Sequence, residues 1–184
     1  DFTASGKSFI RYDESDGKYH GKLKKIIDEL CTKGSVEREQ KIEHLSYLLD
    51  PNQDKIQIDI LFCIATEKAR TNIKNNFDDY LKSVNWQDKV EFNIHIVQLL
   101  EDKLSNDIKN DKDLVEVLKK DEHFVKECII SKSYKVGKND NPWLGFDECA
   151  LPVVLAHNTP NNSLPIIWQD AERFHGLFPR ISRH

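Results

Sequence analysis

The first eight residues, DFTASGKS, combine a carboxylate, a glycine, a lysine and three hydroxyl side chains. Backbone N–H groups and hydroxyls can hold a phosphate, and glycine lets the backbone approach the ligand closely. One interpretation takes Gly6-Lys7-Ser8 as the second half of G-x-x-x-x-G-K-[ST], the loop of P-loop NTPases. Asp1 stands where that motif needs its first glycine, and a carboxylate there would repel phosphate oxygens. A plain turn with Thr3 or Ser5 as a helix cap is the structural alternative.

The same residues fit a second pattern better when they are counted from Asp1. Asp-x-x-x-(Thr/Ser)-Gly-x-(Thr/Ser) is the phosphoribosyl pyrophosphate (PRPP) loop of type I phosphoribosyltransferases, and this chain resembles it with Ser5 and Ser8 in the hydroxyl positions. The resemblance implies that Asp1 engages the ribose hydroxyls and that the 5′-phosphate is bound by the rest of the loop: Thr3, Ala4, Ser5, Gly6, Lys7 and Ser8.

The second polar cluster is the stretch LPVVLAHNTPNNSLPIIW near the end of the chain. Apolar residues flank its turn on both sides, and sites are commonly built on loops held in this way. We therefore expect His157 and Asn158 to act in catalysis, with Thr159, Asn161 and Asn162 binding substrate. The alternative is an ordinary loop whose amides satisfy their own backbone.

A third candidate is the segment NPWLGFDE, which resembles the hood of purine phosphoribosyltransferases. In that hood an aromatic ring stacks on the base and an acid reads its edge. Trp143 or Phe146 would supply the ring and Asp147 the acid, whereas a buried structural tryptophan is the competing interpretation.

Together these segments resemble the phosphoribosyltransferase-like proteins of bacterial conflict and phage-defence loci. The resemblance implies binding of PRPP or a nucleotide 5′-phosphate, with phosphoribosyl transfer or release, and Mg²⁺ carried by the pyrophosphate of PRPP rather than by a metal site of the chain. It also implies a role in anti-phage defence, with proteins or nucleic acid of such a system as partners. A non-catalytic nucleotide-sensing module is the alternative, and a degenerate P-loop NTPase is a less favoured one.

The elements that would position these residues alternate between helix and strand. Apolar spacing predicts helices from about residue 23 to 30 and from 36 to 49, a continuous apolar strand at 55–66, a helix to Val84 and a strand from Val90. Strand, turn and helix in this order predict an α/β fold with a mostly parallel sheet and flanking helices, as in the C-terminal part of a type I phosphoribosyltransferase. We expect residues 1–130 to form this core and residues 131–184 to form a loop-rich extension that completes the site. His95, on the polar side of its strand, should be solvated.

Composition narrows the class of protein. The 184 residues carry a formal net charge of −4, which gives no broad electrostatic reason to expect nucleic-acid binding. The four cysteines show no C-x-x-C spacing and mostly lie in apolar stretches, which is typical of reduced, buried thiols. No apolar run approaches the roughly 20 residues of a membrane span. We expect a cytoplasmic protein.

Overall fold

The computed structural model describes residues 2–31, 55–120, 141–155, 159–171 and 174–178. The chain divides into two compact units, Asp1–Leu100 and Glu101–His184, and each is described by itself. The boundary predicted at residue 130 lies outside the described residues and stays a prediction. Among the described residues, no helix combines the length and apolar character needed to cross a membrane.

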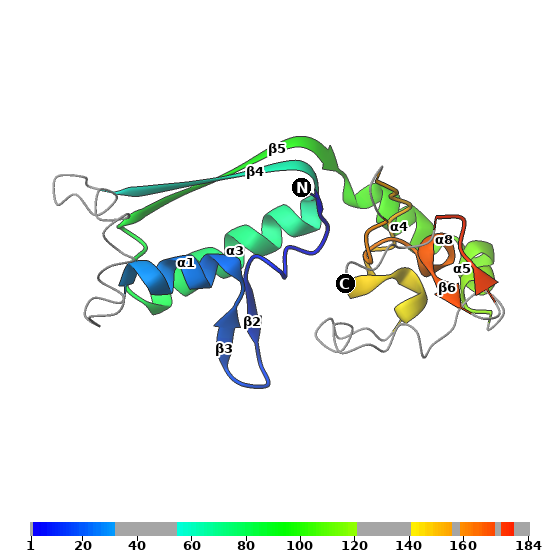
Figure 1. Ribbon diagram of the computed structural model, residues 1–184, viewed down its shortest axis with the longest axis horizontal. Coiled ribbons are helices and arrows are strands. Elements are labelled where there is room, and N and C mark those ends of the chain that lie inside the picture. Colours follow the sequence, from blue (N-terminus) through cyan, green and yellow to red (C-terminus); the bar gives the residue numbers. More distant parts are fainter. Residues whose placement is uncertain (1, 32–54, 121–140, 156–158, 172–173, 179–184) are drawn as a thin grey trace. The chain divides into compact units, whose positions relative to one another are not determined.

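The first unit is built on a parallel sheet with strand order β1-β4-β5 (Figure 1). Its strands are β1 (Phe2–Thr3), β4 (Ile56–Thr66) and β5 (Val90–Leu100), and a hairpin, β2 (Arg11–Asp13) with β3 (Lys18–His20), lies outside the sheet. The helices in the described part of this unit are α1 (Lys22–Cys31) and α3 (Glu67–Ser83). The helix predicted at residues 36–49 lies outside the described residues and stays a prediction. Helix α3 connects β4 to the parallel strand β5, so the predicted strand–helix–strand unit and the α/β class are confirmed.

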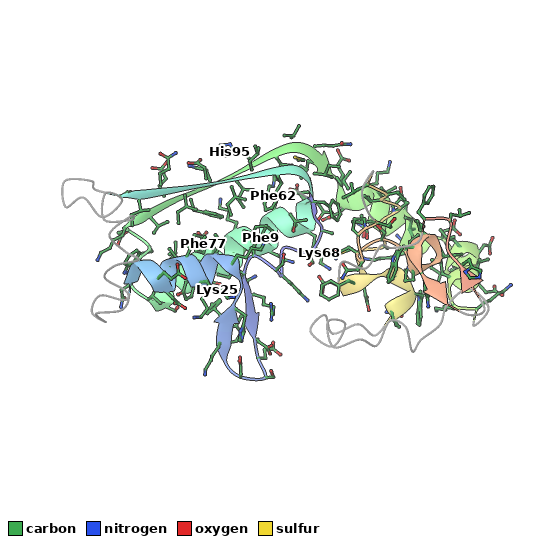
Figure 2. All side chains as sticks on the ribbon, in the orientation of Figure 1. Phe9, Lys25, Phe62, Lys68, Phe77 and His95 are labelled. Atoms are coloured by element: carbon green, nitrogen blue, oxygen red, sulfur yellow. The ribbon has the colours of Figure 1, made fainter. Side chains whose placement is uncertain are left out.

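Helices α1 and α3 cover one face of the sheet. Phe62 of β4 and Phe77 of α3 lie in the resulting core, and Figure 2 shows them between strand and helix. The core also contains Ile10, Leu23, Ile27, Ala65, Ile73, Tyr80, Leu81 and Val90. Burial of this apolar surface is the main force that fixes the helices on the sheet.

Strand β4 is central in the sheet, as predicted, but it is not buried on both sides. Its alternate residues Gln57, Asp59, Leu61 and Cys63 are exposed, because the described helices pack against one face only. The expectation of a buried thiol is therefore wrong for Cys63, whereas Cys149 is buried. His95 of β5 lies on this open face, as expected, and its Nε2 is 2.7 Å from Asp59 Oδ1. This hydrogen bond lowers the pKa of Asp59 below its usual value.

The second unit begins with two short helices. Asp111 ends α4 (Asp102–Asn110) and caps α5 (Lys112–Leu118), since its carboxylate accepts a hydrogen bond from Leu114 N. A core of Leu118, Leu144, Ala150 and Leu164 follows. The other elements among the described residues of this unit are the 3-10 helices η2 (Pro142–Leu144) and η3 (Phe146–Glu148), helix α8 (Pro165–Trp168), and the antiparallel strands β6 (Asp170–Ala171) and β7 (Phe174–His175).

Candidate functional site

The predicted phosphate loop follows β1 at the carboxyl edge of the parallel sheet. Strands β1 and β4 run parallel, with Thr3 opposite Ala65, so the loop at Ala4 starts beside the point where β4 enters α3. This edge is where ligands bind in open α/β sheets. Thr3 and Ser5 are buried at 5% and 6% exposure, Lys7 is half-buried and Ser8 is exposed.

At Gly6 the loop packs so closely against α3 that no side chain would fit. Its φ is +73°, and a Cβ built on it would lie 2.7 Å from Ile73 Cγ1 and 2.9 Å from the carbonyl oxygen of Ala69. Glycine has no Cβ and adopts positive φ without penalty. The glycine of the motif therefore lets the loop pack directly on helix α3.

Four successive carbonyl groups of the loop accept hydrogen bonds from the chain itself. Thr66 Oγ1 donates to Ala4 O at 2.5 Å, and Asn72 Nδ2 donates to Ser5 O at 3.0 Å. The backbone N–H groups of Phe9 and Ile10 donate to Gly6 O, and Arg11 Nη1 donates to Lys7 O at 3.3 Å. The carbonyl side of the loop is thus fixed to the body of the protein.

The opposite side of the loop carries the N–H groups. In a planar trans peptide, the N–H of one residue points away from the carbonyl of the residue before it. Within the described part of the chain, the backbone N–H groups of Ser5, Gly6 and Ser8 have no hydrogen-bond acceptor. The N–H of Lys7, which lies between them in the sequence, donates to Ser5 Oγ at 3.5 Å. The three remaining donors are suited to an anion.

The loop does not run directly into an α-helix. Residues after Gly6 form a single turn, the hairpin β2–β3 follows, and α1 begins only at Lys22. The first N–H groups of α1 are already used, since Lys22 N donates to Ser8 O and Leu23 N to Phe9 O. Any phosphate at this loop would be bound by the turn and not by a helix N-terminus, which also departs from the geometry of a P-loop NTPase.

The chain as a whole was compared with known protein families. A family model described as PRTase-CE matches residues 1–180. The chain belongs to the PRTase-CE family. Its membership makes it a phosphoribosyltransferase-like protein, in agreement with the α/β fold. Searches of curated proteins and of solved structures gave no match.

In this PRTase-CE protein the polar cluster predicted at residues 157–162 belongs to the second unit. Its described residues form hydrogen bonds within that unit. The side chain of Asn162 donates to Phe146 O at 3.1 Å and to Cys149 Sγ at 3.5 Å. Asn161 O accepts from Phe146 N, and the buried Thr159 donates its hydroxyl to Phe178 O. Asp1, His157 and Asn158 lie outside the described residues, so their predicted roles stay predictions.

Trp143 and Asp147 lie near this cluster in sequence but differ in exposure. Trp143 is half-buried against the core, with the ammonium of Lys119 at 5.1 Å from its ring centre. Asp147 is buried at 8% exposure and has a φ of +57°, and Glu148 and Ala150 also have positive φ values. Left-handed backbone at non-glycine residues is uncommon and requires support from the surrounding structure.

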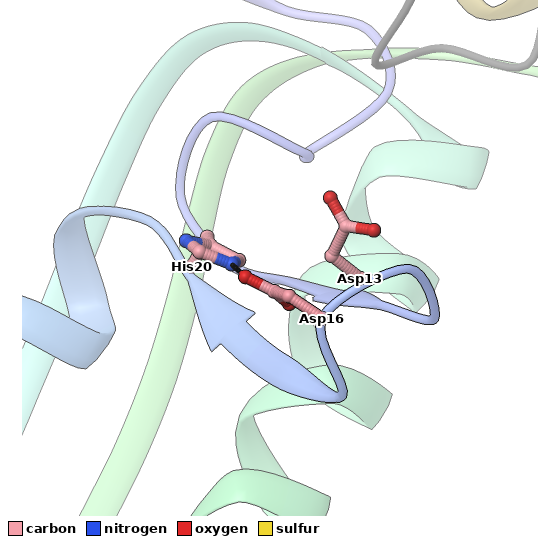
Figure 3. A group of neighbouring side chains, drawn as sticks. All are labelled: Asp13, Asp16 and His20. Atoms are coloured by element: carbon pink, nitrogen blue, oxygen red, sulfur yellow. Dashed lines mark hydrogen bonds and ion pairs between the residues drawn. The ribbon is translucent and has the colours of Figure 1, made fainter.

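A separate group of acidic and histidine side chains lies on the hairpin, at Asp13, Asp16 and His20 (Figure 3). His20 Nε2 is 2.8 Å from Asp16 Oδ2, and Asp13 accepts hydrogen bonds from the hydroxyl and N–H of Ser15. The Ser15 hydroxyl is the main cause of the lowered pKa of Asp13. These hydrogen bonds close the hairpin turn. They explain why the three side chains lie together, so no bound metal ion is needed to explain it.

Three residues that frame the loop, Thr66, Asn72 and Arg11, were not predicted from the sequence. Thr66 had a recognisable signal, since a threonine between a strand and a helix is typical of an N-cap, and its Oγ1 accepts from Ala69 N. Asn72 and Asn76 lie one turn apart on α3, and Asn76 Nδ2 donates to Asn72 O at 2.8 Å. Nothing in the local sequence of Arg11 pointed to the loop.

Proposed function

We propose that the loop from Thr3 to Ser8 binds the 5′-phosphate of PRPP or of a nucleotide, and that the protein transfers or releases a phosphoribosyl group. The observation that carries this proposal is the fixed carbonyl side of the loop, which leaves successive N–H groups on the opposite side. Membership of a phosphoribosyltransferase-like family supports the same ligand class.

The chemistry of the loop suits a phosphate monoester. Backbone N–H groups and the hydroxyls of Ser5 and Ser8 donate hydrogen bonds, and bonds to an ionised acceptor are stronger than neutral ones. The described loop residues offer donors and no carboxylate, so Mg²⁺ would be held by the pyrophosphate of PRPP and would neutralise its charge as it departs.

In the proposed reaction, the bond between C1 of the ribose and the pyrophosphate oxygen breaks. The pyrophosphate leaves with the bonding electrons, and a base nitrogen or a water attacks C1 and then loses its proton. The carboxylate of Asp1 would stabilise the positive charge that develops on the ribose. We further propose that His157 and Asn158 act in catalysis. The residues proposed to bind the substrate are Thr159, Asn161, Asn162, Trp143 and Asp147.

We also propose a biological setting for this activity. The protein would act in the cytoplasm in anti-phage defence, and partner proteins or nucleic acid of a defence system would control it. The residues at the loop allow a direct test in cells. Phage plating on cells that carry the complete system should show protection by the wild-type protein and none by Ser8→Glu, which puts a carboxylate beside the phosphate.

The proposal is tested first by calorimetric titration of the protein with PRPP and ribose 5-phosphate. Ser8 is exposed, so Ser8→Glu should leave the fold intact while the added charge repels the ligand. Gln87→Glu, at another exposed position, is the matched control and should bind as the wild type does. Absence of binding by the wild type would refute the proposal.

Catalysis is tested by pyrophosphate release from PRPP in the presence of Mg²⁺ and a panel of bases. Turnover by the wild type and its loss in Ser8→Glu would establish an enzyme. Tight binding without turnover across the panel would favour the alternative, a nucleotide-sensing module that keeps the loop without the chemistry.

A further inference from the structure

Arg11, the first residue of the hairpin, reaches back to the phosphate loop. Its Nη1 donates to Lys7 O at 3.3 Å, and the residue is half-buried. Its Nε is buried and has no acceptor among the described residues, where no carboxylate lies within ion-pair distance of the guanidinium. Arginines in such surroundings usually form an ion pair. Among the described residues this guanidinium forms none, and the nearby carboxylate of Asp13 interacts with it only at longer range, so Arg11 places a positive charge beside the loop.

The contact with Lys7 O determines the direction of one N–H group. Because the carbonyl of Lys7 points to Arg11, the N–H of Ser8 in the same peptide group points the other way. A charged donor on the carbonyl also polarises the peptide, which makes its N–H a stronger donor to an anion. Arg11 can therefore act on a ligand through the peptide without touching it.

Arg11 differs from the other groups that hold the loop. Thr66, Asn72 and the N–H groups of Phe9 and Ile10 are neutral donors, whereas Arg11 brings a full charge. The hairpin that carries Arg11 is tied to α3, because Tyr12 N donates to Asn76 Oδ1 at 3.3 Å. The segment inserted between the loop and α1 thereby holds a cation in a fixed place behind the loop.

We propose that Arg11 is a positioning residue for phosphate binding: it orients and polarises the Lys7–Ser8 peptide and supplies positive charge behind the loop. This inference rests on the proposed function. Membership of the family says nothing about the hairpin, and this inference gives the hairpin a role in phosphate binding.

The test is the affinity of the full 184-residue chain for ribose 5-phosphate, measured by calorimetry at low and at high ionic strength. Arg11→Met should weaken binding about tenfold at low ionic strength, the loss expected for one charge-assisted interaction. It should also make the affinity less sensitive to salt, because one charge that attracts the phosphate is gone. Arg11→Lys, which keeps a charged donor, should restore most of the affinity and the salt sensitivity.

The matched control is Lys18→Met, which removes the same charge from an exposed position on the same hairpin and should leave the affinity unchanged. Arg11→Gln keeps an N–H donor without the charge, so it provides a second measurement if Arg11→Met lowers the unfolding temperature. Wild-type affinity and salt sensitivity in both neutral variants would overturn the role of Arg11, as would Arg11→Lys binding as weakly as Arg11→Met. If the wild type itself binds no ribose 5-phosphate, the proposed function fails along with this inference.

Discussion

Two loops of this chain are rich in hydroxyl and amide groups, but the chain uses them in opposite ways. In the loop from Thr3 to Ser8, the protein binds the carbonyl groups and leaves N–H groups on the other side. In the loop at residues 159–162, the protein binds the side chains, since Asn162 and Thr159 donate to carbonyls of their own unit. The two loops therefore differ in which of their polar groups already form hydrogen bonds within the fold, and composition alone does not show this.

The largest effect expected in the first loop is that of Gly6→Ala. The new Cβ would strike Ile73 and the Ala69 carbonyl at a positive φ, and we expect a loss of about 2 to 4 kcal/mol of unfolding free energy with no remaining phosphate binding. Urea unfolding and calorimetric titration measure the two effects.

Gly17→Ala is the control for Gly6, because Gly17 also has a positive φ, of +66°, but the nearest atom to its Cβ is 3.7 Å away. It should cost only about 1 kcal/mol, from backbone strain alone, and keep phosphate binding. Equal losses from the two substitutions would contradict the packing of the loop on α3.

The next effect is that of Thr66→Val, which removes the hydroxyl that caps α3 and holds Ala4 O. We expect a loss of about 2 kcal/mol, because a helix cap is lost and a buried carbonyl is left without its donor, together with weaker phosphate binding. Thr66→Ser keeps the hydroxyl and should behave almost as the wild type.

Ser163→Ala provides the comparison in the second unit, since the buried Ser163 donates to Val153 O at 2.6 Å. It should lower stability by roughly 1 to 2 kcal/mol and leave phosphate affinity unchanged. A loss of affinity as large as that of Thr66→Val would show that the two loops are not as different as their hydrogen bonds indicate.

A smaller effect on phosphate affinity is expected from Asn72 but not from Asn162, although both side chains donate to backbone carbonyls. Asn72→Ala frees Ser5 O and should weaken ribose 5-phosphate binding about threefold to tenfold, for a stability loss of about 1 kcal/mol. Asn162→Ala should cost a similar amount of stability without changing that affinity. If Asn162→Ala stays folded and loses phosphate affinity, the second loop belongs to the phosphate site.

The sequence predicted the main parts of the first unit for clear physical reasons. Apolar spacing located α1, α3, β4 and β5, and the hydroxyl and glycine pattern predicted a phosphate loop at residues 3–8, which stays a prediction. It did not predict the hairpin at 11–20, because its ten residues carry no apolar periodicity, nor the bonds of Thr66, Asn72 and Arg11 to the loop. These contacts join residues up to 67 positions apart, as in the pair Asn72 and Ser5, and depend on the register of the sheet and the docking of α3. The exposed face of β4 was also missed, since a continuous apolar run does not reveal how many helices cover it.

The smallest effect tests whether the loop depends on the distant contact between α1 and α3. Burial raises the pKa of Asp28, but hydrogen bonds from Lys24 and the Tyr80 hydroxyl outweigh it, and the net shift is downward. A lowered pKa in the folded state stabilises the fold above the unfolded pKa, and this stabilisation is lost as the pH falls through the folded value. Asp28→Asn should therefore cost about 0.5 kcal/mol at neutral pH, a modest figure because the carboxylate is partly solvated, and less near pH 2. Urea unfolding at the two pH values measures this difference, and unchanged ribose 5-phosphate affinity at neutral pH would show that the loop is held by α3 and the hairpin rather than by α1.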